Sequence, residues 1–463
     1  MLASAGILQN LSPRYKDIDP CTNFDQYVCE GFNEKHDLRP DQGRLFTGTL
    51  MAENGEQILR HLLEAPYSEM EAVMTMSSVD KAIFDKLQDA YSACLDESEI
   101  KKVESAPLID VLKEIERRFG AGQQADHLGA GFAQSGKQQP LGLTLGADES
   151  LNKVMTYLAT IGVTALVDIG TGADDRDPDV VVPFLNAPRQ PGLPSKQYYE
   201  DSEILENYAK VIGQVLEGLL KEANSTVQTD DVPLKALSAE LVEKIVHFEH
   251  TLARATPATE EAEDPEFYYN PMTLDEISTI LPQFSLDKFI QSVTLDAPKP
   301  AKIIVGAPSY LQTLSTVLNV TSAETLQAYF VWKTVQRYAY KVEDDALKPL
   351  KRFNNELQGK DLDATPERWR TCVQVADRSL GWILSRFFVQ KSFSEGARLF
   401  GDQIVSDIKR EFVEKLENAR WMSEGVRKLG VEKGKQQSRS LFLRSLQLWG
   451  TPDVKFLSGS YLP

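Results

Sequence analysis

Five histidines are the side chains of this sequence best suited to hold a catalytic metal ion: His36, His61, His127, His247 and His250. A zinc hydrolase needs two histidines one helical turn apart, a glutamate between them as general base, and a distant third ligand. No His-Glu-x-x-His pattern occurs in the 463 residues. The nearest pattern is His247-Phe248-Glu249-His250, which has no evident third and fourth ligands. We therefore expect an ordinary surface helix here, and no catalytic or metal-ligating residue in this chain.

Two other stretches have compositions that could bind a ligand. The acidic run Asp174, Asp175, Asp177 and Asp179 lacks the glycine and the terminal glutamate of an EF-hand calcium loop. It is predicted to be a solvated turn. Residues 323–341 are rich in aromatic side chains at helical spacing, which indicates a core helix rather than a cofactor site.

The cysteines are few and widely spaced: Cys21, Cys29, Cys94 and Cys372. No Cys-x-x-Cys pattern is present, which argues against a structural zinc site. Thr22 and Asp25 favour a short helix between the first two cysteines. The ends of such a helix lie ~12 Å apart, beyond the ~7 Å that a disulfide spans, so each cysteine needs a partner elsewhere.

Composition excludes several classes of partner. The net charge of −18 opposes binding to nucleic acid or to an anionic membrane surface. No apolar run is long enough to span a bilayer, and residues 1–11 have no basic segment typical of a signal peptide. With 42% hydrophobic and 25% charged residues, the chain resembles a soluble globular protein with two or three domains.

Helical periodicity dominates the elements that must position these side chains. It predicts helices over 54–95, 107–119, 151–161, 203–256, 323–341, 366–393 and 400–421. Residues 120–140 are predicted to be a loop, and a capping box is expected at Thr273 and Glu276. Residues 163–169 and 180–185 indicate two strands joined by a polar turn, and residues 303–305 indicate another short strand. The predicted fold class is mainly α, a multi-helix domain with a small β-hairpin at about 163–185.

Three motifs occur in an order typical of one protein family. They are Asp19-Pro20-Cys21-Thr22-Asn23-Phe24-Asp25-Gln26-Tyr27-Val28-Cys29-Glu30-Gly31-Phe32, then Gly192-Leu193-Pro194-Ser195-Lys196-Gln197-Tyr198-Tyr199, then Asn270-Pro271-Met272-Thr273-Leu274. With a late match from Trp421 to Lys433, they resemble the N-terminal helical portion of the neprilysin family of zinc metalloendopeptidases. The resemblance runs from about Ser12 to about Lys433, and the family's zinc-binding portion does not appear in this sequence.

The resemblance implies roles for several residues. Cys94 and Cys372 match family cysteines that form a disulfide; two buried free thiols are the alternative. Cys21 and Cys29 match cysteines that bond to the catalytic domain, so they are expected to be unpaired here. Arg44 lies near a family arginine that grips a peptide carboxylate, although a second such arginine falls at Ala52; an ordinary surface arginine is the alternative.

The resemblance also implies an organisation and a function. Residues 1–50 are expected to pack on a catalytic domain, residues 51–433 to form a helical lid, and residues 434–463 stay unassigned. The chain is expected to belong to a peptide-cleaving enzyme, to bind no cofactor itself although the family uses zinc, and to be inactive and self-associating alone. A non-catalytic peptide-binding or regulatory module is the alternative. The family resemblance favours a secreted protein or an ectodomain, with possible glycosylation at Asn10, Asn224 and Asn319.

Overall fold

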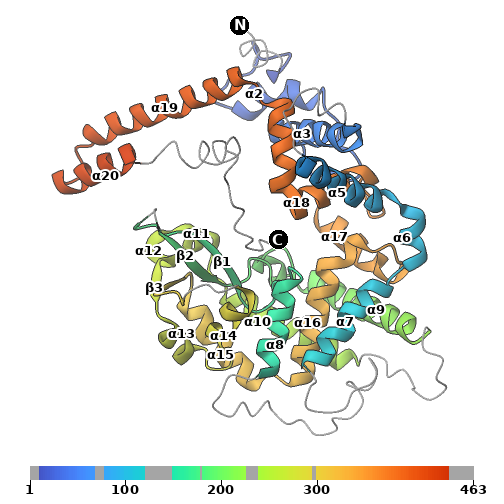
Figure 1. The fold of residues 1–463 in the computed structure, drawn as a ribbon. Helices are drawn as coiled ribbons and strands as arrows, with labels where there is room; N and C mark the ends of the chain where they lie inside the picture. Colours follow the sequence, from blue (N-terminus) through green and yellow to red (C-terminus); the bar gives the residue numbers. More distant parts are fainter. Residues whose placement is uncertain are drawn as a thin grey trace.

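The computed structural model describes residues 10–67, 78–119, 149–177, 180–225, 238–294 and 299–436. These residues are mainly helical and contain one small sheet, which confirms the predicted fold class. The predicted loop at 120–140, and residues 437–463 of the unassigned tail, lie outside the described residues. The helices form two bodies with separate apolar cores and a projecting pair of helices (Figure 1).

The larger unit, here called the main body, contains the described residues between 105 and 357 and surrounds the larger core. Its helices are α7 (Ala106–Phe119), α8 (Glu149–Thr160), η1 (Lys196–Glu200), α9 (Ser202–Ser225), α10 (Ala239–Ala255), α11 (Thr259–Glu263), α12 (Pro265–Tyr268), α13 (Leu274–Ile280), α14 (Leu286–Val293), α15 (Pro308–Val320), α16 (Ala323–Tyr338), η2 (Ala339–Lys341), η3 (Asp345–Leu347) and α17 (Lys348–Leu357).

Helix α16 runs through the centre of the main body. Tyr329, Phe330 and Trp332 on this helix have no exposed surface, so the prediction that the aromatic helix belongs to the core is confirmed. The N–H of its buried indole is paired: Trp332 donates to the Tyr208 hydroxyl at 2.7 Å. Burying large rings with their N–H groups satisfied gives a rigid centre on which the other helices pack.

The sheet has the strand order β1-β2-β4-β3. Strands β1 (Asp168–Ala173) and β2 (Val181–Asn186) form the predicted hairpin. Strand β4 (Ile303–Val305) pairs parallel to β2, and β3 (Asn270–Met272) pairs antiparallel to β4. The hairpin is therefore held to the helical core by a buried strand that comes more than a hundred residues later in the chain.

The first strand begins later than expected. Within residues 163–167, Val163, Ala165, Leu166 and Val167 are buried, but the segment forms no strand. Two core tyrosines take their carbonyl groups instead: Tyr329 donates to Ala165 at 2.9 Å, and Tyr310 donates to Leu166 at 2.7 Å. The apolar pattern thus correctly predicted that these side chains are buried, but the strand that it also predicted does not form here.

The smaller unit, here called the disulfide body, packs around the second core. Its helices are α3 (Thr47–Glu64), α5 (Ser78–Leu95), α6 (Glu97–Val103) and α18 (Arg368–Ser392). Helix α18 lies against α3 and α5, where Arg370 bridges to Glu56 at 3.0 Å. The chain passes between the two bodies twice, after α6 and after α17.

The N-terminal helix α2 (Phe24–Asn33) begins one residue later than the sequence suggested. The expected Thr22 cap is wrong, because Asn23 caps the helix and accepts from the Gln26 N–H at 3.0 Å. The Thr22 hydroxyl instead donates to Asp19 at 2.9 Å. The expected capping box at Thr273 and Glu276 is confirmed.

Two antiparallel helices, here called the arm, follow α18 and project beside the sheet (Figure 1). They are α19 (Glu395–Glu417) and α20 (Glu424–Gln436). The Lys433 ammonium donates to the Asp175 carbonyl in the hairpin turn at 3.4 Å. The arm therefore extends from the disulfide body to the far end of the main body.

Candidate functional site

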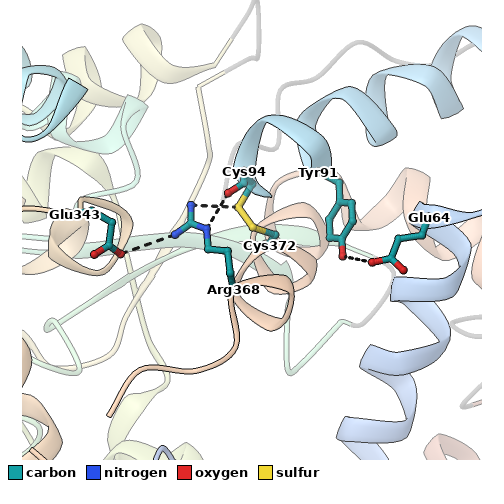
Figure 2. Close-up of a disulfide and its surroundings, with 6 residues drawn as sticks. All are labelled: Glu64, Tyr91, Cys94, Glu343, Arg368 and Cys372. Carbon is teal, nitrogen blue, oxygen red and sulfur yellow. Dashed lines mark hydrogen bonds and ion pairs between the residues drawn. A yellow bond between two sulfur atoms is a disulfide. The ribbon is translucent and has the colours of Figure 1, made fainter. Parts of the chain in front are cut away.

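A disulfide joins Cys94, near the end of α5, to Cys372, in the first turns of α18 (Figure 2). The two Cα atoms are 5.6 Å apart, and the bond closes a loop of 278 residues. In the chain-entropy model, closing a loop of this length stabilises the fold by about 5 kcal/mol. The bond therefore fixes α18 to α5 across the entire main-body insertion.

Arg368 connects this disulfide to the main body (Figure 2). Its Nε donates to the Cys94 carbonyl at 2.8 Å, and its Nη1 lies 4.0 Å from a Glu343 carboxylate oxygen. On the other side, the Tyr91 hydroxyl donates to Glu64 at 3.0 Å, and burial raises the pKa of Tyr91 to about 12. The disulfide thus lies among hydrogen bonds of its own body, and the ion pair of Arg368 with Glu343 connects it to the main body.

A carboxylate is buried at the centre of the main body, and sequence reasoning missed it. Glu249 has no exposed surface and accepts hydrogen bonds from Tyr208 at 2.8 Å and Tyr199 at 3.2 Å. Burial raises its pKa to about 7, while the nearby Lys333 ammonium opposes that shift. The signal was present in the sequence, because Glu249 falls on the apolar face of α10 between Phe248 and Leu252.

The Gly-Leu-Pro-Ser segment packs directly against this carboxylate. A Cβ on Gly192 would lie 2.0 Å from Glu249 Oε2, so any other residue here would displace the Glu249 carboxylate. The next N–H, of Leu193, donates to the Tyr199 hydroxyl at 2.9 Å, and Tyr199 in turn binds Glu249. This motif therefore serves to bring the chain after β2 into the core.

A cleft of about 960 Å³ opens in the main body beside this segment. Its walls come from the end of α8, the start of β1, the segment after β2, and the ends of α16 and α17. Its charged lining residues are Asp168, Arg189, Lys333 and Arg337. Burial raises the pKa of Asp168, and the positive charge of Arg189 opposes that shift. The cleft is thus lined by three cations and one carboxylate in a strongly acidic protein.

The side chains of the described residues do not fit a zinc site. His247 is exposed, whereas His250 is half-buried and its ring stacks on Tyr199 with 5.7 Å between centroids. Glu249, between them, points into the core. Across the described ranges no group of three histidine, cysteine or carboxylate side chains could hold a metal ion. Zinc chemistry therefore has no donor set in this part of the chain.

The arm has a large uncovered apolar face. The side chains of α19 and α20 and of the turn between them that form this arm face are 43–82% exposed: Leu399, Phe400, Ile404, Val405, Ile408, Phe412, Trp421, Val426 and Leu429. Helix α20 packs on α19 at Val413 and Leu416. Exposed apolar patches of this extent mark surfaces that contact another protein or domain.

Comparison with known proteins now identifies the family. Residues 20–438 match the sequence model of peptidase family M13. The chain belongs to peptidase family M13. The resemblance to the neprilysin family drawn from the sequence motifs is therefore confirmed.

Sequence relatives of this M13 chain include two curated peptidases. Human endothelin-converting enzyme 1 is 24% identical over 439 residues, covering 93% of this chain and 50% of the relative. Mouse neprilysin is 23% identical over 446 residues, covering 93% of this chain and 54% of the relative. The M13 chain thus spans about half the length of the curated relatives it matches.

Solved structures show the same fold. The zinc metalloprotease Zmp1 of Mycobacterium tuberculosis, determined with an inhibitor, has a TM-score of 0.69 at 18% identity and is matched over 92% of this chain and 57% of its own. PepO of Lactobacillus rhamnosis has a TM-score of 0.60 at 16% identity, over 86% and 56% respectively. The M13 chain therefore shares its fold with about half of each of these structures.

The remaining residues that the sequence singled out lie at separate places in the M13 chain. Cys21 is exposed and Cys29 is half-buried; both are free thiols, and burial raises the pKa of Cys29. Arg44 is exposed, with its guanidinium 5.7 Å from the Phe46 ring centroid. A Cβ on the preceding Gly43 would lie 1.8 Å from the Gln358 carbonyl oxygen, so this segment passes against the end of α17.

The acidic turn is not fully solvated as predicted. Asp174 is buried, pairs with the Lys302 ammonium, and accepts from the Tyr269 hydroxyl at 2.6 Å. The hydrogen bond from Lys302 lowers the pKa of Asp174 to about 2. Local composition suggested a solvated turn, but Lys302 and Tyr269 come from distant parts of the sequence and cover this carboxylate.

Three further expectations concern the surface of the M13 chain. Asn319 is exposed near the end of α15, Asn10 is half-buried, and Asn224 lies in the last turn of α9. Within the described ranges, no helix is both long and apolar enough to cross a membrane.

Proposed function

We propose that this chain forms the N-terminal, substrate-enclosing part of an M13 zinc metallopeptidase that cleaves peptides. The family match over residues 20–438 is the observation that carries the proposal. The relatives are about twice as long, and no His-Glu-x-x-His occurs in this sequence. On this proposal, another part of the enzyme supplies the zinc ligands, and this chain alone is inactive.

The arm face is the proposed docking surface for that zinc-binding part. About half of each curated relative is not matched by this chain. A domain of that size would be large enough to cover the arm face. The N-terminal segment 1–50 is proposed to face the same partner, because Phe24, Leu38 and Phe46 on it are more than half exposed. Residues 51–433 are proposed to form the lid, with the main body as its principal part.

The free cysteines fit the same proposal. Cys21 is exposed and Cys29 half-buried, so both thiols are available to bond with cysteines of the zinc-binding part. The Cys94–Cys372 disulfide is of the kind found in oxidising compartments. We therefore propose a secreted protein or an ectodomain, with Asn10, Asn224 and Asn319 as candidate glycosylation sites.

The deciding experiment measures zinc and activity on the purified full chain. We expect less than stoichiometric zinc by mass spectrometry and no hydrolysis of fluorogenic peptides when zinc is supplied. Stoichiometric zinc together with chelator-sensitive hydrolysis would overturn the proposal, because it would require a complete metal centre within this chain.

A non-catalytic peptide-binding module is the second candidate, and the cleft of about 960 Å³ favours it. The two candidates differ in what covers the arm face. A chain that needs a zinc-binding part should self-associate and bind a hydrophobic dye when alone. A dye-silent monomer that still binds peptides would instead support the independent module.

A further inference from the structure

Two arginines that line the cleft form no ion pair within the described part of the chain, although the charge of Arg189 acts on the nearby Asp168 carboxylate. Arg189, on the segment after β2, and Arg337, in the last turn of α16, both line the cleft. Neither guanidinium forms a hydrogen bond or an ion pair with another described residue. They come from elements about 150 residues apart and line one cleft only because the main body folds around it.

Several other arginines of the described chain, by contrast, form ion pairs. Arg370 bridges to Glu56 at 3.0 Å, Arg352 to Asp363 at 2.6 Å, and Arg386 to Asp80 at 2.6 Å. Acidic side chains are abundant in a protein of net charge −18. Because Arg189 and Arg337 form no ion pair and Lys333 lines the same cleft, cations outnumber the single carboxylate, Asp168, in its lining.

Other lining groups shape the same cleft. Lys333 is 8% exposed, donates to the Gln190 carbonyl at 3.1 Å, and faces the buried Glu249, so part of its charge is already balanced. Asp168 is the acidic residue among the lining groups, and its charge reduces but does not cancel that of the arginines. Amide side chains of Gln190, Asn354 and Gln358 add hydrogen-bonding groups, and Met155, Val163 and Phe289 add apolar wall.

We propose that this cleft binds a carboxylate group of an acidic peptide between Arg189 and Arg337. A guanidinium matches a carboxylate geometrically and can donate two parallel hydrogen bonds to it. The apolar wall would accept the aliphatic part of a glutamate or of a C-terminal residue. The inference rests on the proposed function for its choice of a peptide, and it adds a preference for acidic substrates.

The test is a binding titration with the full chain at low ionic strength. The probe is a fluorescein-labelled hexapeptide containing two glutamates, and its counterpart carries glutamine at those positions. We expect the acidic peptide to bind and Arg189→Ala or Arg337→Ala to weaken it about tenfold each, the cost of losing one charge-assisted pair. The glutamine peptide should bind as weakly as the variants do.

Arg378→Ala is the matched control, because Arg378 is exposed on α18, outside the cleft. It removes the same charge and should leave affinity within about twofold, since distant surface charges are screened. Thermal melts should show all three variants folded, because none of the substituted side chains forms a hydrogen bond or an ion pair with another described residue.

Equal binding by the wild type and both cleft variants would overturn the assignment, as would equal binding of the two peptides. Displacement of the peptide by equimolar inorganic phosphate would also overturn it, by showing a site for small anions. None of these measurements depends on hydrolysis or zinc, so failure here and failure of the proposed function are separately visible.

Discussion

Some ionisable side chains of this protein are buried away from water. Glu116 on α7 is 9% exposed, and its Oε1 has no hydrogen-bond partner within the described ranges. Burial raises its pKa from 4.5 to about 8, with a smaller opposing effect from Lys113. The folded protein therefore holds a proton on Glu116 that the unfolded chain releases at neutral pH.

This difference predicts how stability depends on pH. Because the folded pKa is the higher one, the folded state is favoured below pH 4.5 and loses that advantage as pH rises towards 8. The loss is at most about 1.4 kcal/mol for each pH unit in that interval. We expect Glu116→Gln to unfold like the wild type near pH 4.5 and to be the more stable protein near pH 8.

Urea unfolding across this pH range checks the prediction. Asp110→Asn is the control, since the Asp110 side chain is 79% exposed on the same helix. If the two variants show the same pH dependence relative to wild type, burial of Glu116 is not the cause.

At the scale of elements, the disulfide joins two helices whose sequence positions are far apart. We expect Cys94→Ala with Cys372→Ala to lower the free energy of unfolding by about 3–5 kcal/mol, because the unfolded chain regains the entropy of a 278-residue loop. Denaturant melts of the variant, and of the wild type with reductant, should agree.

Cys21→Ser with Cys29→Ser is the matched pair, since these thiols are free. An unchanged melting midpoint for the Cys94 and Cys372 variant would show that packing of α18 on α3 and α5 suffices without the bond.

Sequence periodicity predicted most elements but not their long-range pairings. The stripes on α7, α8 and α10 are buried as expected, because each helix carries its own apolar face. Residues 163–167 were misjudged as strand because Tyr310 and Tyr329 take their carbonyls. The same limit hid the pairing of Asp174 with Lys302 and the placement of Arg189 and Arg337 in the lining of one cleft, since only the folded chain creates these arrangements.

At the scale of the whole molecule, the arm leaves more large apolar side chains exposed than any other part that the structure describes. Phe400, Ile408 and Phe412 recur at helical spacing, yet each is at least 55% exposed. The apolar stripe that predicted α19 therefore faces outward rather than into a core. This face accounts for the expected self-association of the isolated chain.

Changing Phe400, Ile408 and Phe412 together to serine should reduce hydrophobic-dye fluorescence several-fold and shift the chain towards monomer in sedimentation. Helical circular dichroism should be largely retained, because these side chains contribute little to either core. Val320→Ser removes an isolated apolar side chain that is 75% exposed and should change neither measurement. If the triple variant binds the dye as strongly as the wild type does, the dye-binding surface lies elsewhere on the molecule.

The covalent link between residues 94 and 372 has a practical consequence for anyone handling the protein. A protease that nicks the backbone anywhere between these two positions leaves both fragments attached to each other. Such a clipped molecule would migrate as one band on a non-reducing gel and separate into two only after thiol treatment. Purity should therefore be judged under both conditions.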